Sequence, residues 1–192
     1  MLGFIVEGHM EADIIKHLCA SAEVRRLQMN GLNFPINKIC DRIVPQVKML
    51  YRKNLRKLIV VIDREQRDVG SEEFESVIRS ELLSRGINCE NIIITAPDRN
   101  FECWIAPFLN ERCELTNEFQ GEIEGRNGKS AIRAMYKKVG KTYVETVDGV
   151  KLFKLVNPHR LREKSPSFER FMRLFNEECW WINRYSDELP GI

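Results

Sequence analysis

The chain has 192 residues, of which 43% are hydrophobic and 30% are charged, a composition that suits one compact domain and excludes a largely disordered chain. Its longest apolar run covers residues 58–62, far short of the ~20 residues that span a bilayer, so we expect no membrane segment. The formal net charge is only +2, and the opening segment carries Glu7 in place of a basic leader. We therefore expect no signal or transit peptide and a cytoplasmic location.

The charge is strongly segregated along the chain. Residues 38–58 contain seven Lys or Arg against one acid, residues 59–125 contain fifteen acids against six Arg, and residues 126–173 contain thirteen Lys or Arg against four acids. Such runs are commonly solvated helix faces. An acidic centre between two basic segments is also typical of carboxylates that hold divalent cations beside surfaces that bind phosphates. Charge alone leaves both interpretations open.

The N-terminal half alternates between strand and helix patterns. Residues 2–6 form a short apolar, β-branched run that ends at Glu7-Gly8, and a helical pattern follows at once. Residues 22–37 are mixed and contain turn signals, and a helix is expected over residues 37–53. The pattern predicts a strand, a tight turn and a helix, followed by a connection and a second helix.

Two further strand and helix pairs follow. Residues 58–62 form a continuous apolar run, which is typical of a strand covered on both faces in a parallel sheet. Residues 71–85 read as a helix, residues 92–95 as a strand, and residues 101–109 as another helix. This alternation predicts an α/β fold with a mostly parallel sheet flanked by helices.

The C-terminal part contains the strongest hairpin signal of the chain. Asp148-Gly149 lies between two strand-like runs, residues 143–147 and 150–156. Helices are expected over residues 130–138 and from Ser167 onward. The sequence therefore predicts a hairpin followed by a helix after the parallel sheet.

The cysteine spacing gives no sign of a metal or redox site. The six cysteines are Cys19, Cys40, Cys89, Cys103, Cys113 and Cys179. They form no C-x-x-C pair and no Cys/His cluster with the spacing of zinc ligands. We expect reduced thiols that pack as small hydrophobes.

Acidic side chains follow three of the predicted strands, at the end where a parallel sheet opens. These acids are Glu7 after the first strand, Asp63, Glu65 and Asp68 after the second, and Asp98 and Glu102 after the third. If the strands are neighbours, the carboxylates converge in one crevice. Close carboxylates repel one another, which raises their pKa values unless a cation is present. Because hard oxygen ligands suit Mg²⁺ or Mn²⁺, a metal site is expected there.

Taken singly, several of these acids have simpler interpretations. Glu7 is typical of an acid that complements a helix dipole, and Asp63 and Glu65 are typical of solvated turn acids. Glu102 is different because it lies inside the otherwise apolar stretch FECWIAPF, where a carboxylate needs a compensating group. Only the four acids together favour a metal site.

Four segments, in this order, resemble the Toprim family. FIVEGHMEADII resembles its first signature, a hydrophobic strand that ends in Glu-Gly with a second acid at the helix start, and LIVVIDREQRD resembles its second, a strand that ends in an acidic pair. TAPDRNFECWIAPF and TYVETVDGVKLFKLVNPHRLREKSPSFERF resemble segments of small standalone Toprim-like proteins of bacterial defence and restriction-type gene sets. The resemblance implies one Toprim-like, Rossmann-like domain over residues 1–192, with a core of about residues 1–109 and a C-terminal hairpin and helix appendage of about residues 126–192.

The resemblance also implies a Mg²⁺- or Mn²⁺-dependent nuclease that cuts phosphodiester bonds as the effector of a defence system. Carried over residue by residue, it makes Glu7 a general acid/base or metal ligand, and Asp63, Glu65 and Glu102 catalytic metal ligands. Asp68 is a weaker candidate ligand. The family pattern has Asp where this chain has the longer Glu65. Two other functions stay open: a non-catalytic module that binds nucleic acid or a partner, and a nucleotidyl transferase with the same metal site.

Two basic segments are candidates for binding phosphate groups. Arg160, Arg162 and Lys164 precede a predicted helix, and the sequence favours phosphate contact there no more than a plain exposed loop. The Gly-Lys-Ser tripeptide at residues 128–130 resembles the end of a P-loop, but Ile123 stands where that motif needs glycine. Nucleic acid binding at the first segment is therefore a hypothesis, and we expect no ATP hydrolysis at the second.

The resemblance implies a protein partner as well. Proteins that this chain resembles commonly lie beside an ABC-type ATPase, and a small nuclease with an open site needs control by another chain. Trp180 and Trp181 near the C-terminus suit a docking surface, because aromatic anchors carry much interface energy. The sequence leaves self-association into a homo-oligomer open.

Overall fold

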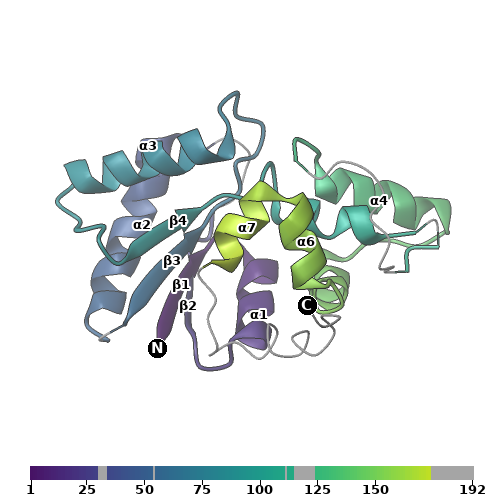
Figure 1. The fold of residues 1–192 in the computed structure, drawn as a ribbon, viewed down its shortest axis with the longest axis horizontal. Helices are drawn as coiled ribbons and strands as arrows, with labels where there is room; N and C mark the ends of the chain where they lie inside the picture. The colour runs from purple at the N-terminus through teal and green to yellow at the C-terminus, as the bar shows by residue number, and fades with distance from the viewer. Residues whose placement is uncertain (30–33, 54, 111, 115–123, 174–192) are drawn as a thin grey trace, which may run out of the picture.

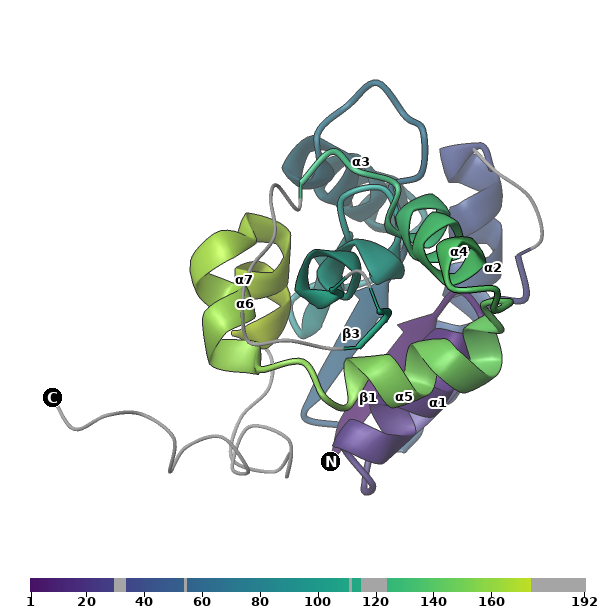
Figure 2. The same cartoon turned by 90° about the vertical axis from the view of Figure 1, so that its right-hand side faces the viewer.

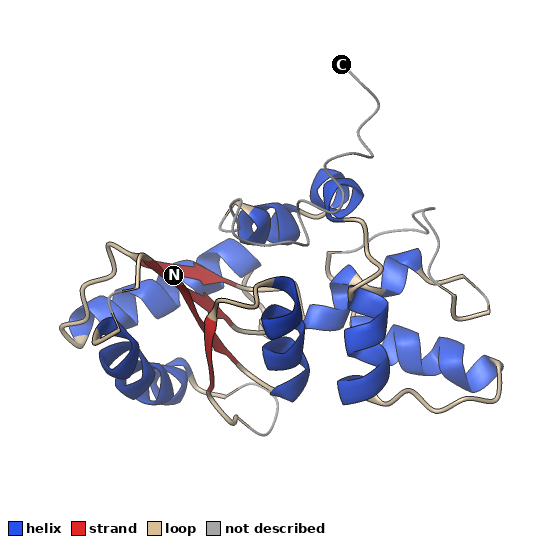
Figure 3. Ribbon diagram, turned by 90° about the horizontal axis from the view of Figure 1, so that it is seen from below, coloured by secondary structure: helices blue, strands red, loops and turns tan. Residues whose placement is uncertain are grey.

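The computed structural model describes residues 1–29, 34–53, 55–110, 112–114 and 124–173. Within these ranges the chain folds around a four-stranded, all-parallel sheet with helices on both faces (Figure 1, Figure 3). The strands, in the spatial order β2-β1-β3-β4, are β1 (Leu2–Val6), β2 (Glu23–Arg26), β3 (Lys57–Val61) and β4 (Ile92–Thr95). The α/β class and the parallel sheet are therefore as predicted.

Helices connect the strands and continue beyond the sheet. The α-helices are α1 (His9–Leu18), α2 (Ile36–Tyr51), α3 (Ser71–Ser84), α4 (Gly128–Lys138), α5 (Val150–Phe153), α6 (Pro158–Lys164) and α7 (Pro166–Met172). The 3₁₀ turns are η1 (Phe101–Trp104) and η2 (Ala106–Phe108), and η3 (Glu145–Gly149) is a π-helical turn. The bounds of α2, α3 and α4 agree with the predicted helices to within two residues.

β2 is an edge strand that the sequence pattern did not reveal. Its residues read Glu-Val-Arg-Arg, are all half-buried, and pair with β1 from Gly3↔Glu23 to Val6↔Arg26. The backbone N–H of Leu27 continues the pairing with a hydrogen bond to the Val6 carbonyl (2.9 Å). An edge strand lies at the border of the sheet and needs no continuous apolar run. Its mixed composition is therefore compatible with a strand.

The sheet separates two apolar cores, because alternate side chains of a strand point to opposite faces. In β1, Phe4 and Val6 pack with α1 and the C-terminal helices, whereas Ile5 packs with α2 and α3. All three side chains are fully buried, and each such burial stabilises the fold by about 1.5–3 kcal/mol. Ile132 of α4 and Phe168 of α7 belong to the first core. The C-terminal helices therefore share a core with the sheet.

Two 3₁₀ turns replace the single helix expected over residues 101–109. A proline in the second turn lacks the N–H that a continuous helix would need. Trp104 of the first turn stacks on Phe171 of α7 (ring centroids 5.1 Å apart), and its Nε1 donates a hydrogen bond to Ser167 Oγ (3.0 Å). These contacts fix the turn that carries Glu102.

The prediction of a hairpin around Asp148-Gly149 is wrong, because this part of the chain forms η3 and α5. Gly149 has a φ of −57°, whereas the favoured two-residue hairpin turns need positive φ. The Asp148 carboxylate accepts a hydrogen bond from the Val144 N–H (2.7 Å), which closes the turn locally. A Cβ on Gly149 would lie 2.3 Å from Met10 Sδ. The glycine therefore permits close packing against α1, along which α5 lies (Figure 2).

Two other expectations concern membranes and thiols. Within the described ranges, no helix is long and apolar enough to cross a membrane. Cys40, Cys89, Cys103 and Cys113 are free and buried, as expected. Cys19 is disulfide-bonded, so the expectation of a reduced thiol is wrong for that residue, and nothing in the cysteine spacing signals it.

Candidate active site

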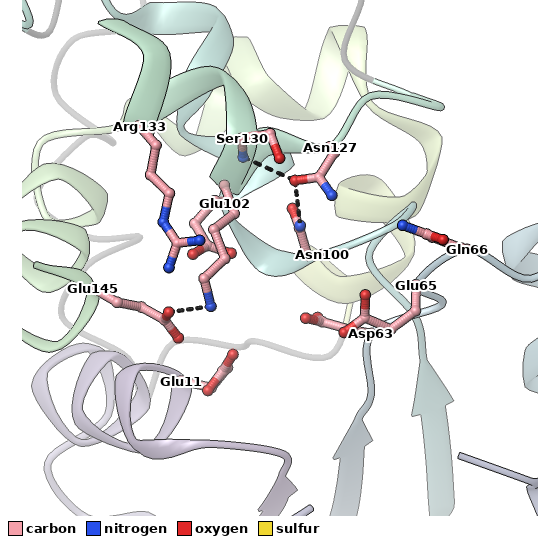
Figure 4. Close-up of a pocket in the computed structure, with 11 residues that line it drawn as sticks. Glu11, Asp63, Glu65, Gln66, Asn100, Glu102, Asn127, Ser130, Arg133 and Glu145 are labelled. Atoms are coloured by element: carbon pink, nitrogen blue, oxygen red, sulfur yellow. Dashed lines mark hydrogen bonds and ion pairs between the residues drawn. The ribbon is translucent and has the colours of Figure 1, made fainter. Parts of the chain in front are cut away.

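Acidic side chains gather at the carboxyl edge of the sheet, where the chain leaves β1, β3 and β4. These three strands are parallel neighbours, so the residues that follow them reach the same edge. Glu7 comes directly after β1, Asp63 lies just beyond β3, and Glu102 lies in η1 beyond β4. Figure 4 shows Asp63 and Glu102 on opposite sides of one cleft, with Glu11 below them.

Two adjoining cavities, of about 390 and 510 Å³, form this cleft. Both are lined by Glu11, Asp63, Glu65, Lys129 and Glu145. Glu102 lines the first cavity and Glu7 the second, so the four candidate catalytic residues all border the cleft. Asp68 is exposed and lines neither cavity. Glu11, Lys129 and Glu145 had no assigned role in the sequence-based predictions.

Glu7 and Asp63 are held together across β1 and β3. The backbone N–H of Asp63 donates a hydrogen bond to Glu7 Oε2 (3.2 Å). Burial, together with the nearby charges of Glu11 and Glu65, raises the pKa of Glu7 to about 7. Burial and the neighbouring charge of Glu7 also raise the pKa of Asp63 well above its ordinary range. The pair therefore favours a proton or a cation over two bare negative charges.

Glu65 lies on a strained loop. Its φ is +59° and that of Arg99 is +76°, a left-handed conformation that costs non-glycine residues about 1–3 kcal/mol. The Glu65 N–H donates to the Arg99 carbonyl (2.6 Å), which joins the loops after β3 and β4. Burial raises the pKa of Glu65. Because a strained non-glycine residue lines the cleft, the geometry favours a functional role for Glu65.

Arg67 supports the same loop from behind. Its guanidinium donates to the carbonyls of Phe34 (2.6 Å) and Arg64 (2.7 Å) and lies 4.6 Å from the ring centroid of Phe74. Its positive charge lowers the pKa of Glu7 and so opposes part of the effect of burial. Arg67 therefore fixes the loop and supplies positive charge near the acids without lining the cleft.

Asp98 follows β4 but has a structural role. Arg64 Nε donates to Asp98 Oδ1 (2.5 Å), and both side chains are largely buried. The other Asp98 oxygen accepts a hydrogen bond from the Gly125 N–H. Because its charge is matched by Arg64 and it does not line the cleft, Asp98 is not part of the candidate site.

Glu11 lies one helical turn after Glu7. It is buried, and its Oε2 accepts a hydrogen bond from the Gly8 N–H (3.1 Å) at the start of α1. Burial raises the pKa of Glu11, and the charge of Glu145 raises it further. Glu7 and Glu11 both line the second cavity, and the charge of Glu11 raises the pKa of Glu7.

Glu102 is the most isolated acid of the cleft. Its side chain is 2% exposed, and its Oε1 has no hydrogen-bond partner among the described residues. Burial, with a smaller contribution from the charge of Glu145, raises its pKa to about 8. An unpartnered buried carboxylate oxygen is costly. A proton or a bound cation on Glu102 would therefore offset this cost, since no hydrogen bond from the described residues does so.

The first turn of α4 is packed directly against the turn that carries Glu102. A Cβ on Gly128 would lie 2.1 Å from the backbone nitrogen of Cys103, so only glycine fits there. The Gly128 N–H donates to Asn100 Oδ1 (3.1 Å), and Asn127 caps the helix by accepting from the Ser130 N–H (2.9 Å). The Gly-Lys-Ser tripeptide thus serves close helix packing rather than a P-loop.

This packing brings Lys129 into the cleft. Lys129 Nζ forms an ion pair with Glu145. Burial lowers the pKa of Lys129, but the hydrogen bond to Glu145 and the charges of Glu102 and Glu145 outweigh this effect and raise the pKa overall. Glu145 begins the π-helical turn η3, a rare conformation that occurs frequently at functional sites. Among the residues that line the two cavities, Lys129 and Arg133 carry the positive charge of Lys or Arg side chains. These two cations face six acids, so the cleft has an excess of carboxylates.

The donor set of the cleft suits a hard divalent cation. Its acids offer carboxylate oxygens, which Mg²⁺ and Mn²⁺ prefer, and Glu102 Oε1 is buried without a partner. Across the described ranges, no group of three or more His, Cys, Asp or Glu is arranged to hold a metal ion. The residues present fit such a cation by chemistry, and binding would require these side chains to draw closer together.

The predicted phosphate-binding residues lie elsewhere. Arg160, Arg162 and Lys164 belong to α6, and none of them lines the cleft. Arg162 is ion-paired with Glu169 of α7, which matches its charge. Phosphate binding by these residues stays a prediction. Residues 180–181, the proposed docking tryptophans, lie outside the described residues.

The comparisons with known proteins leave the site to be interpreted from its own geometry. No protein-family model, curated protein or solved structure matches the chain. The fold class and the cleft are therefore the basis on which a function is assigned.

Proposed function

We propose that this chain is a Toprim-like, Mg²⁺- or Mn²⁺-dependent nuclease that cuts the phosphodiester bonds of nucleic acid. The observation that carries the proposal is the cleft itself: six acids, with raised pKa values for five of them, face two cationic side chains at the carboxyl edge of a parallel sheet. The six acids are Glu7, Glu11, Asp63, Glu65, Glu102 and Glu145. Divalent cations would relieve this repulsion.

Each candidate residue has a distinct part in the proposed reaction. Asp63, Glu65 and Glu102 would hold the cation, which when bound stabilises the charge that develops on the phosphate. Glu7 Oε2 is engaged by the Asp63 N–H, so Oε1 is the oxygen that accepts a proton from the attacking water. A pKa near 7 suits this task, because a general base works best when its pKa lies near the working pH.

The proposal is tested by replacing Asp63 with Asn, a substitution of equal size. We expect Asp63→Asn to reduce cleavage of plasmid DNA, single-stranded DNA or RNA in Mg²⁺ or Mn²⁺ by about 100-fold or more, because a charge that acts in the transition state is lost. Glu90→Gln is the matched control, since Glu90 is exposed and lies outside the cleft. Cleavage that persists in purified Asp63→Asn protein would contradict the nuclease assignment.

A second function has a specific observation in its favour. Glu65 stands where the Toprim pattern has Asp, and the described acids are not arranged as a ready metal site, which favours a non-catalytic module that binds nucleic acid or a partner. Titration with Mg²⁺ and Mn²⁺ separates the two functions. Intact nucleic acid binding without any metal binding would favour the non-catalytic module, and incorporation of labelled nucleotides would identify a nucleotidyl transferase instead.

We also propose, from the resemblance, that a cytoplasmic ABC-type ATPase controls the nuclease in a bacterial defence system. We expect the chain to co-purify with the ATPase encoded beside it, and we expect cleavage by the pair to depend on ATP, since this chain has no P-loop. The measurement is the nuclease assay with and without ATP, with Asp63→Asn as the control for contaminating nucleases. A chain that is fully active alone and indifferent to the ATPase would contradict the partnership but not the metal site.

A further inference from the structure

One face of α4 carries a regular row of basic side chains. The helix buries Gly128, Ile132 and Tyr136 against the core. Directly beside this buried row lie Lys129, Arg133 and Lys137, which follow one another at intervals of four residues. We call these three residues the α4 stripe. Each interval advances about 6 Å along the helix, so the stripe extends over two turns.

The α4 stripe begins inside the cleft and leads out of it. Lys129 and Arg133 line the first cavity, and Figure 4 shows the Arg133 side chain directed from α4 toward the acids. Lys137 is exposed one turn farther along the helix. A negatively charged chain that follows the stripe therefore arrives at the carboxylates.

Among the described residues, most of the positive charge around α4 has no acidic partner. Within the described part of the chain, no ion pair involves Arg126, Arg133, Lys137, Lys138 or Lys141. By contrast, Arg162 pairs with Glu169, and Arg170 pairs with Glu72 and Glu75. Cations without partners cost nothing in broken ion pairs when they bind a phosphate. Apart from Lys129, which pairs with Glu145, the charge near α4 is thus available to bind a phosphate next to the cleft.

We propose that the α4 stripe binds successive backbone phosphates of one single-stranded segment of nucleic acid and guides that strand into the cleft. The stripe is a single row of charges on one helix, which matches one strand. The cavities of about 390 and 510 Å³ have the size of small-molecule sites and do not admit a duplex. Because this role rests on the proposed function, its test has to separate binding from cleavage.

The test measures binding of a labelled single strand, as DNA and as RNA, by fluorescence anisotropy in EDTA, so that no metal-dependent cleavage occurs. We expect Arg133→Gln/Lys137→Gln to weaken binding about tenfold and to lower the slope of log K against log[salt] by about 1.4, since each phosphate contact on a single strand contributes about 0.7. The matched control is Lys48→Gln/Arg52→Gln, two exposed cations at the C-terminal end of α2 on the other face of the sheet, which we expect to bind as the wild type does.

Several outcomes would overturn the role of α4. These are wild-type protein that binds neither strand, α4 variants that bind no more weakly than the α2 control, and a duplex of the same sequence that binds more tightly than the single strand. A third variant, Arg160→Gln/Lys164→Gln, compares α6 directly: a larger loss there than on α4 also rejects the stripe. If the α4 variants lose binding but wild-type protein never cleaves with Mg²⁺ or Mn²⁺, the stripe stands and the nuclease proposal fails. If wild-type protein cleaves and the α4 variants bind normally, the nuclease proposal stands and the role of the α4 stripe is rejected.

Discussion

The metal-free protein is expected to lose stability as the pH rises from about 5 to about 8, and Mg²⁺ is expected to restore it. Glu102 has a pKa of about 8 in the folded protein against an ordinary value of 4.5. Between these values the folded state binds more protons than the unfolded state, so the free energy of unfolding falls with rising pH. At about 1.4 kcal/mol per pH unit, this one group changes stability by up to about 5 kcal/mol.

Thermal denaturation at several pH values measures this effect. For a chain of this size, about 5 kcal/mol corresponds to a change of at most roughly 10–20 °C in the melting temperature, and relaxation of the cleft will reduce it. Glu102→Gln should flatten the profile and remove much of the gain from Mg²⁺ at pH 8. Glu90→Gln should keep the wild-type profile. A wild-type melting temperature that is constant or rises over this pH range would show that Glu102 is not buried as described.

Apolar runs predicted three of the four strands of the sheet, because buried parallel strands need them. β1, β3 and β4 lie where continuous apolar segments predicted strands, and their shared direction follows from the alternation with helices. The edge strand Glu23–Arg26 has half-buried, mostly charged residues, so no local pattern reveals it. The hairpin prediction at Asp148-Gly149 failed for the opposite reason. A strong local turn signal was overridden by the tertiary contact of Gly149 with Met10.

The residues of the candidate site likewise fall into those that the sequence could predict and those that it could not. Glu7, Asp63 and Glu102 were predicted to meet in one cleft because topology alone brings the ends of neighbouring parallel strands together. Lys129 and Glu145 reach the cleft through the packing of α4 and η3 on the core, which no sequence interval encodes. Gly128 is the one sequence feature that could have pointed to Lys129, because only glycine allows α4 to pack so closely on the backbone of Cys103. That meaning becomes clear only when the positions of the two backbones are known.

Replacing Glu7 with Gln is expected to reduce nuclease activity by about 10²–10⁴-fold, the usual contribution of a general base. In the proposed reaction Glu7 Oε1 takes a proton from the attacking water, and the amide of Gln cannot accept it, while the amide oxygen can still accept the Asp63 N–H. In the wild type, activity should rise with pH through the deprotonation of Glu7, whose pKa is about 7 without metal. A bound cation lowers that pKa, so the rise should lie at or below pH 7 in Mg²⁺.

The pH dependence of cleavage separates a proton acceptor from a residue that only shapes the site. Glu7→Gln should lose the acidic limb of the wild-type profile, whereas Glu65→Asp, which keeps a carboxylate at this position, should retain the limb and much of the rate. Titration with Mn²⁺ and a melting curve establish that each variant folds and binds metal. Because other acids of the cleft also have raised pKa values, a Glu7→Gln protein that keeps the limb would assign the titrating group to one of them and contradict the role of Glu7 as proton acceptor.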